Sequence, residues 1–285
     1  MGSLGRRVVV AVVGIPLVAG AVYAGGLGLA LLLATCAAVG AWEFHRLAGH
    51  RASEPIVTAG IALAAAVPIV THLVRLGWVA APLASGGGIF VALLALLLWS
   101  RGPTERPIEG IAVTTFAVLY CGATLTFAYA LRHHRFVVEA EAGLALVLFP
   151  VVLTWLSDTS AYGFGRWLGR RKLMPSVSPG KTVAGTVGGL VVSIAGAWLY
   201  NDLVLRPTAQ LALTPWTALA FGAVVSGVGQ VGDLVESLFK RQAGVKDSSR
   251  ILSAHGGVLD RLDSLYLVIP ASYLILSRLL LAAPR

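Results

Sequence analysis

The sequence predicts an all-α, polytopic integral membrane protein with about nine transmembrane helices. Of its 285 residues, 57% are hydrophobic and 12% are charged. A soluble domain carries about 25% charged residues, so this chain has too few polar side chains to cover a water-soluble globule of its size. Its apolar residues also form runs of about 20, the length of helix that crosses a bilayer. Both observations favour a multi-pass membrane protein.

The predicted spans follow one another along the whole chain, separated by short polar loops. They cover, in order, 7–24, 26–43, 56–73, 78–99, 110–131, 143–164, 184–204, 213–236 and 262–283. Several contain proline, which membrane helices tolerate because neighbouring groups satisfy the freed backbone atoms.

Lysine and arginine predict the orientation. With the N-terminus in the cytoplasm, 16 of the 22 basic residues fall on the cytoplasmic side, as the positive-inside rule requires. Nine spans then place the C-terminus outside. The net charge of +9 is distributed over these short loops, so we expect contacts with membrane lipids and no nucleic-acid partner.

The chain divides into a supporting and a chemical part. Residues 1–140 are expected to form a scaffold of transmembrane helices with lipid and oligomer contacts. Residues 141–285 are expected to form the catalytic region. This region holds the two longer polar loops, 165–183 and 237–261, both predicted to be cytoplasmic.

Acidic residues are scarce, and several collect in the C-terminal half. Asp158 lies inside a predicted span, and Asp233 lies near the end of another. Ionisable groups within spans are costly and are usually paired or functional. On a continued helix Asp233, Ser237 and Lys240 share one face, and Asp260 and Asp263 share one side of a turn.

Three of these carboxylates could bind a divalent cation. Mg²⁺ prefers oxygen ligands, often one or two carboxylates together with substrate phosphates. Asp233, Asp260 and Asp263 could supply such a magnesium site, with room for a second cation. The alternative is that Asp260 and Asp263 pair with Arg261 and Arg250 and only help the last helix to begin.

Two basic, glycine-containing segments could contact phosphate groups. The first runs from Lys240 to Asp247 and on to His255-Gly256-Gly257, where glycine allows close backbone approach or positive φ. The second is 178–182, Ser-Pro-Gly-Lys-Thr. It is not a P-loop, because the required glycine five positions before Gly180 is Pro175.

The chain resembles the phosphatidate cytidylyltransferase family. The resemblance is strongest from Ser237 to Asp263, through Ser-Leu-Phe-Lys-Arg, then Lys-Asp, then His-Gly-Gly-Val-Leu-Asp-Arg-Leu-Asp. It extends to Gln230–Ser237, Ser157–Tyr162, Ser178–Thr182 and, less specifically, Trp42-Glu43-Phe44. The chain departs from the family pattern at Ser253, Gly180 and Val183-Ala184.

The resemblance implies a Mg²⁺-dependent transfer of CMP from CTP to phosphatidate in the cell membrane, with the site facing the cytoplasm. It leaves room for a homodimer. The implied catalytic residues are Asp233, Ser237, Lys240, Asp260 and Asp263. The implied substrate-binding residues are Ser178, Lys181, Thr182, Arg241, Lys246, Asp247, His255, Gly256, Gly257 and Arg261.

Two other functions fit parts of the pattern. A transporter would also carry acids within its spans, but they should lie near the bilayer midplane, and inverted halves should be detectable. Another membrane-embedded lipid nucleotidyl- or phosphotransferase, acting on a phospholipid or isoprenoid lipid, is the nearer alternative. Those that use CDP-activated alcohols carry their acids in one compact helical run, whereas here two helices and a basic loop carry them.

Overall fold

The chain is helical along most of its length. The computed structural model describes residues 3–49, 56–80, 83–100, 106–249, 251 and 256–282. Within them, seven helices are long and apolar enough to cross a membrane: Gly26–Ala48, Val57–Arg75, Pro107–Arg132, Ala140–Leu168, Val183–Ala209, Pro215–Gln242 and Leu259–Leu279. Gly14–Ala24 and Gly87–Leu96 are shorter apolar helices. The helical, multi-pass membrane class is confirmed, while the count of nine and the orientation stay predictions.

Two compact units make up the chain, and neither is one continuous stretch of sequence. Unit 1 consists of Met1–Ala21, Gly26–Tyr129 and Gln242–Arg261. Unit 2 consists of Val22–Gly25, Ala130–Arg241 and Leu262–Arg285. The proposed functional division into 1–140 and 141–285 stays a prediction.

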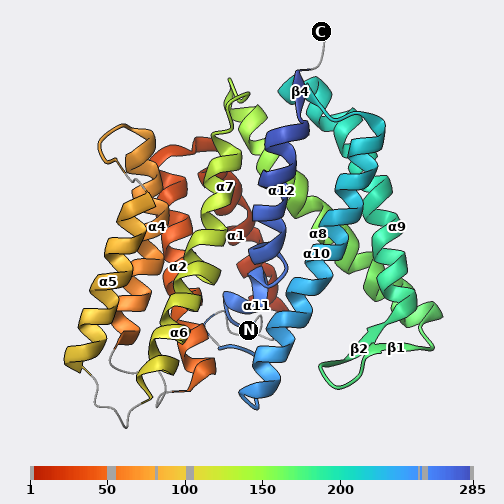
Figure 1. Cartoon of the computed structure of the whole chain (residues 1–285). Coiled ribbons are helices and arrows are strands. Elements are labelled where there is room, and N and C mark those ends of the chain that lie inside the picture. The colour runs from red at the N-terminus through yellow and green to blue at the C-terminus, as the bar shows by residue number, and fades with distance from the viewer. Residues whose placement is uncertain are drawn as a thin grey trace. The chain divides into compact units, whose positions relative to one another are not determined.

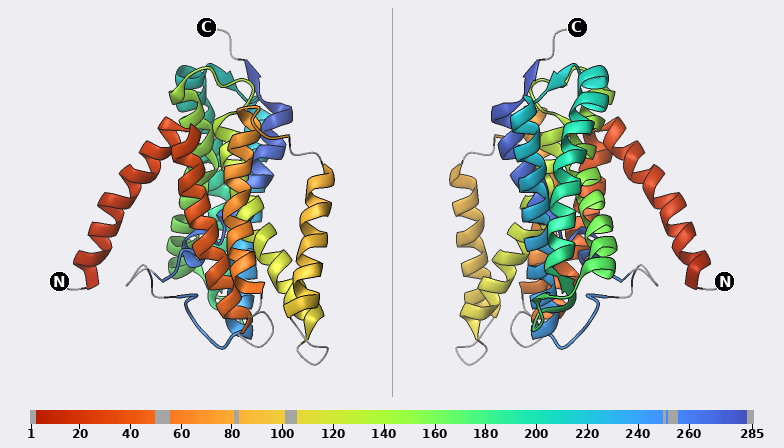
Figure 2. Two further views of the ribbon diagram at one scale, coloured as in Figure 1. Left: turned by 90° about the vertical axis from the view of Figure 1, so that its left-hand side faces the viewer. Right: turned by 90° about the vertical axis from the view of Figure 1, so that its right-hand side faces the viewer.

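Unit 1 is built around α2 (Gly26–Ala48) and α4 (Val57–Arg75), which run side by side (Figures 1 and 2). It also contains most of α1 (Ser3–Ala24), α5 (Leu83–Ser100), α6 (Pro107–Ala117), the π-helix η2 (Val118–Ala123) and the start of α7 (Thr124–Arg132). At Gly122 an added Cβ would lie 2.7 Å from the Ala64 carbonyl oxygen. Small residues therefore set how closely η2 and α4 approach.

Buried polar pairs cross the interior of unit 1. The ring Nδ1 of His72 lies 2.7 Å from the Tyr129 hydroxyl, and both residues are less than a tenth exposed. Buried polar groups need such partners, because an unsatisfied group in an apolar medium is costly.

Unit 2 consists mainly of α8 (Ala140–Leu168), α9 (Val183–Tyr200), α10 (Pro215–Gln242) and α12 (Leu265–Leu279). Helix α9 continues as the π-helix η3 (Asn201–Ala209). The four-residue α11 (Leu259–Leu262), of which only Leu262 belongs to unit 2, precedes α12. α8 and α9 lie along one another (Figure 1). Short strands β3 (Leu211–Ala212) and β4 (Leu281–Ala282) pair antiparallel.

Glycines in α9 and α10 allow close helix packing in unit 2. A Cβ added at Gly185 would lie 2.5 Å from the Ala161 carbonyl oxygen of α8, and one at Gly222 would lie 2.6 Å from that of Ser193. Membrane helices commonly associate through such small residues, because van der Waals contact between backbones replaces the hydrophobic driving force.

The polar segment 165–183 contains more regular structure than a loop. Helix α8 continues to Leu168, and β1 (Lys172–Met174) and β2 (Ser178–Thr182) then form an antiparallel hairpin. The sequence shows no strand signal here, because the strands are three and five residues long and Pro175 and Gly180 interrupt any alternation. Helix α10 likewise extends six residues beyond the predicted span end at 236.

The glycine contacts of α10 give a stability test. Gly222→Ala should lower the free energy of unfolding by about 1–3 kcal/mol, because its Cβ would meet the Ser193 carbonyl and the Ala197 side chain. Gly227→Ala, in the same helix with nothing within 4 Å of the added Cβ, is the matched control. The measurement is thermal or denaturant unfolding of the purified protein in detergent. Equal stability of the two variants would contradict the close packing of α9 and α10.

Candidate functional site

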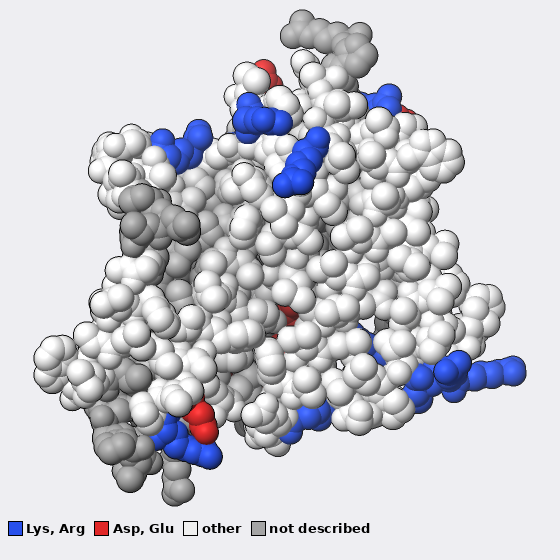
Figure 3. Space-filling model, viewed as in Figure 1, with Lys and Arg blue, Asp and Glu red and all other residues white. Residues whose placement is uncertain are grey.

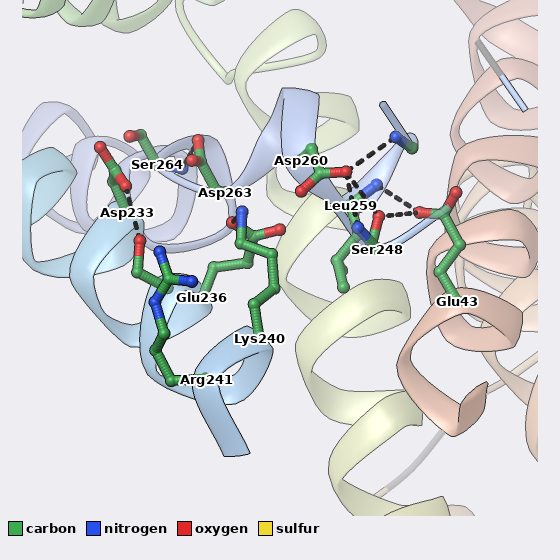
Figure 4. Close-up of polar contacts among 12 residues, drawn as sticks. Glu43, Asp233, Glu236, Lys240, Arg241, Ser248, Leu259, Asp260, Asp263 and Ser264 are labelled. Carbon is green, nitrogen blue, oxygen red and sulfur yellow. Dashed lines mark hydrogen bonds and ion pairs between the residues drawn. The ribbon is translucent and has the colours of Figure 1, made fainter. Parts of the chain in front are cut away.

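A carboxylate and a lysine from distant parts of the sequence pair in unit 2. Asp233 lies in α10, and its Oδ2 is 2.7 Å from the Nζ of Lys181 in strand β2. Its other oxygen accepts a 3.3 Å hydrogen bond from the hydroxyl of Ser237, one helical turn later (Figure 4). The predicted shared face of Asp233 and Ser237 is present. Both members of the ion pair remain partly exposed, at 24% and 32%, so the pair is open to a ligand.

Two further carboxylates lie within electrostatic reach of Asp233. Asp158 comes from α8, and Asp263 comes from the turn before α12; each interacts with the charge of Asp233. Asp263 Oδ1 also accepts a 2.6 Å hydrogen bond from the amide of Ser264. We call Asp158, Lys181, Asp233 and Asp263 the acid–lysine cluster.

Gly232 makes this arrangement possible. A Cβ at this position would lie 2.8 Å from the carbonyl oxygen of Asp263 and 3.0 Å from the Cα of Ser264. The backbone of α10 therefore touches the backbone at Asp263 immediately beside Asp233. Any larger residue would push the two carboxylates apart.

The next turn of α10 carries a second ion pair. Lys240 Nζ lies 2.5 Å from a carboxylate oxygen of Glu236, which is fully buried (Figure 4). The Lys240 side chain is 15% exposed. Arg241 is exposed, and its Nε donates a 3.1 Å hydrogen bond to the Val177 carbonyl in the hairpin turn. The basic residues that end α10 are therefore held by an acid of α10 and by the hairpin.

The residues of the hairpin segment 178–182 make different contacts. Lys181 faces Asp233, and its Nζ also lies 3.5 Å from the Gln230 carbonyl. Thr182 is buried, and its hydroxyl accepts a 3.1 Å hydrogen bond from the Gly185 amide as the N-cap of α9. Ser178 is half-buried at the start of β2. The Thr182 hydroxyl therefore caps a helix, and the predicted role of Thr182 in substrate binding stays a prediction.

Exposed basic residues surround the base of the hairpin. Arg166, Arg170, Arg171 and Lys172 are exposed at the end of α8 and the start of β1. On the face shown in Figure 3, blue side chains gather over the hairpin. Such a group favours anionic partners such as phosphate groups.

Asp260 lies in a separate hydrogen-bond network in unit 1. Its Oδ2 accepts three hydrogen bonds, at 2.8–2.9 Å, from the amide and hydroxyl of Ser248 and from the amide of Gly257. Gly256 has φ +79°, and a Cβ there would lie 2.7 Å from the same oxygen. The glycine pair was predicted to have a positive φ or a close backbone approach. Gly256 shows both, and the group that it approaches is the Asp260 carboxylate.

Glu43 joins this network from α2, and it is absent from the predicted site. The side chain is fully buried and accepts hydrogen bonds from Ser248 and Leu259 (Figure 4). It also accepts hydrogen bonds from Ser249 and Val258. The available signals were an acid at the end of an apolar segment and the weakly specific Trp42-Glu43-Phe44 resemblance.

The remaining predicted residues lie in or near 244–261. Lys246 and Asp247 are exposed, and within the described residues neither makes a hydrogen bond or an ion pair. Arg261 is also exposed, at the end of unit 1. His255 and Ser253 lie outside the described residues, as does Arg250 of the alternative pairing for Asp260 and Asp263.

The predicted metal ligands are suited to Mg²⁺ by their chemistry. Asp233, Asp260 and Asp263 offer hard carboxylate oxygens, as this cation prefers. Asp233 and Asp263 belong to unit 2 and Asp260 to unit 1, although Asp260 and Asp263 are three residues apart. Over the described residues, no group of three or more His, Cys, Asp or Glu side chains could by itself hold a metal ion. A bound Mg²⁺ would therefore need ligands from its substrate, as is common for phosphate-bound magnesium.

The helices and their charged clusters define a multi-pass membrane protein whose few acids meet lysines and backbone amides. The sequence profile of the Cytidylyltransferase family matches residues 5–279, so the chain belongs to that family.

Curated relatives carry a more specific name. A protein of Staphylococcus saprophyticus named phosphatidate cytidylyltransferase is 43% identical over 159 residues, which cover 56% of each chain. Proteins of the same name from Staphylococcus epidermidis and Staphylococcus aureus are 43% and 41% identical over the same length. The matched part spans a little over half the length of these curated relatives.

Thr182 offers a test of the site's local structure. Thr182→Ala should lower the free energy of unfolding by about 1 kcal/mol, because it removes the N-cap of α9. Thr182→Ser keeps the capping oxygen and should retain most of that stability. Unfolding in detergent measures both. Equal losses in the two variants would show that the methyl group, and not the cap, stabilises this position.

Proposed function

We propose that the chain is a phosphatidate cytidylyltransferase that converts CTP and phosphatidate to CDP-diacylglycerol and pyrophosphate. The observation that carries the proposal is the acid–lysine cluster, a set of three carboxylates and a lysine in a chain that is poor in charge. Family membership and the names of the relatives support it.

The reaction depends more on neutralising the negative charge of the two substrates than on general acid–base catalysis. A phosphate oxygen of phosphatidate attacks the α-phosphorus of CTP, and the bond from that phosphorus to the oxygen bridging to the β-phosphate breaks. Pyrophosphate leaves with those bonding electrons. The nucleophile is already ionised, so no strong general base is needed. Both substrates are anions, and catalysis rests on positioning them and neutralising charge.

Carboxylates of the site suit a metal-bound triphosphate. Asp233 and Asp263 of unit 2 would hold Mg²⁺ through their oxygens, with room for a second cation. Asp260 as a third ligand stays a prediction from the sequence. When bound, the metal would supply neutralisation of phosphate charge. Lys181 would keep Asp233 in place, because the two are already paired at 2.7 Å.

Basic residues would receive the phosphate groups of the substrates. Lys240 would neutralise phosphate charge while Glu236 fixes its position, and Ser237 would orient Asp233. The exposed Arg241, Lys246 and Arg261 would contact phosphate oxygens, with Ser178, Asp247, His255 and the glycine pair 256–257 shaping the binding segments. Thr182 would act indirectly, by starting α9 next to Lys181.

The setting of the reaction follows from its substrates. CTP is water-soluble and phosphatidate is a bilayer lipid, so the site would open both to the cytoplasm and to the membrane. The proposed location is the cell membrane, which the chain would cross several times with its apolar helices. A homodimer is compatible with this arrangement.

A reconstituted assay tests the reaction. The purified protein in liposomes, given labelled CTP, phosphatidate and Mg²⁺, should form lipid-linked CMP and release pyrophosphate. Asp263→Asn should reduce turnover by about 100-fold or more, because it removes a carboxylate charge from the site. Asp202→Asn is the matched control, since Asp202 is exposed in η3 and, among the described residues, pairs with Arg206 alone. Absence of lipid-linked CMP with the unaltered protein would exclude the assignment.

The proposed magnesium requirement has its own test. Chelation with EDTA should abolish formation of lipid-linked CMP, and added Mg²⁺ should restore it, because the triphosphate charge is otherwise not neutralised. Asp233→Asn should raise the Mg²⁺ concentration needed for half-maximal activity. Full activity in EDTA would contradict a metal-dependent reaction.

A further inference from the structure

Glu43 binds a segment of chain more than 200 residues later in the sequence. It lies in the last two turns of α2, and its side chain is fully buried. Oε1 accepts hydrogen bonds from the Ser249 hydroxyl at 2.5 Å and the Val258 amide at 3.1 Å. Oε2 accepts from the Leu259 amide at 2.6 Å and the Ser248 hydroxyl at 3.2 Å. One carboxylate therefore holds the side chains of Ser248 and Ser249 and the backbone amides of 258–259; we call this contact the Glu43 clamp.

The donors of the clamp require a carboxylate. Each oxygen receives one backbone amide, Val258 on Oε1 and Leu259 on Oε2. An amide N–H cannot turn into an acceptor, so a glutamine here would direct its own NH₂ donors at one of these amides in either orientation. Aspartate keeps two acceptor oxygens but is shorter by one methylene.

The clamp is connected directly to Asp260. The Ser248 hydroxyl lies 3.2 Å from Glu43 and 2.8 Å from Asp260, so the two carboxylates share its single proton, and the Ser248 amide donates to Asp260. A Cβ at Gly257 would lie 2.3 Å from Glu43 Oε1, and the Gly257 amide donates to Asp260. Ser248 and Gly257 thus touch both carboxylates.

A purely structural contact would not need a charge here. A buried carboxylate in a membrane helix is costly, and well-packed apolar residues commonly stabilise a core as well as buried ionic groups do. The Glu43 carboxylate differs from an apolar side chain because its hydrogen bonds are directional. Four donors converge on its two oxygens, and this fixes the local conformation of the chain.

We propose that Glu43 is a positioning residue, which holds residues 248–249 and 258–259 so that Asp260 keeps its place in the reaction. This inference rests on the proposed function for the role of Asp260. It assigns part of the site to the first half of the chain, which was expected to act as a scaffold.

Hydrogen exchange of the full-length protein in detergent tests the clamp without reference to activity. In Glu43→Gln, the peptide covering 256–262 should exchange roughly 10- to 100-fold faster, because its amides lose a charged acceptor. Glu43→Asp should give an intermediate rate. Two variants in unit 1 are controls: Glu109→Gln, the same change at a half-exposed residue, and Tyr129→Phe, which removes a different buried hydrogen bond. Neither should change exchange at 256–262.

Mg²⁺ titration of the reconstituted enzyme tests positioning. Glu43→Gln should reduce kcat and raise the Mg²⁺ concentration for half-maximal activity, each by roughly 10- to 100-fold, as removal of partners behind metal ligands does. Glu43→Asp should recover part of both. Partial unfolding alone would lower the maximal rate and leave the Mg²⁺ midpoint unchanged, as we expect for Tyr129→Phe.

The outcomes separate the two proposals. Unchanged exchange in Glu43→Gln would overturn the clamp, and faster exchange with an unchanged Mg²⁺ midpoint would overturn the positioning role. If the unaltered protein forms no lipid-linked CMP, the proposed function fails, and the exchange data alone decide whether Glu43 positions the Asp260 segment.

Discussion

A carboxylate inside a membrane protein persists only where donors or cations meet it, and this constraint organises the functional part of the chain. Glu43 is met by two hydroxyls and two backbone amides, Glu236 by Lys240, and Asp233 by Lys181 and Ser237. Each acid ties an apolar helix to another segment or to its own next turn. The ion pairs differ in exposure: Glu236 is fully buried, whereas Asp233 remains partly open. Only an open pair can exchange its partner for a ligand.

Backbone proximity supports these contacts in both units. Gly232 brings α10 against the backbone at Asp263, and Gly257 brings its own backbone against Glu43 and Ser248. In each case the space that a Cβ would occupy is taken by the atoms that position a carboxylate. Glycine at these two places sets the distance of a carboxylate from its neighbours: Asp263 from α10 in one case, and Glu43 from Gly257 in the other.

The sequence predicted what depends on composition and local spacing. Long apolar runs gave the helices, and the four-residue spacing of Asp233 and Ser237 gave their contact on α10. It could not predict partners that only tertiary structure brings together. Lys181 pairs with Asp233, 52 positions away, a contact that local spacing does not indicate, and its predicted phosphate contact stays a prediction. Glu43 was overlooked, because nothing local connects it with Leu259, 216 positions later. The hairpin was missed because its strands are too short to show a pattern.

The length of chain between Glu43 and its donors has a consequence for biosynthesis. Ribosomes add roughly 5–20 residues per second, so residues 248–259 emerge on the order of 10–40 s after α2. Throughout that interval the Glu43 carboxylate lacks the four donors that it has in the finished protein. Residue 43 lies near the end of α2, where a charge can stay at the water boundary until its donors arrive. Assembly of unit 1 therefore ends with a late step, in which the Glu43 carboxylate becomes buried once Ser248, Ser249, Val258 and Leu259 are available as hydrogen-bond donors.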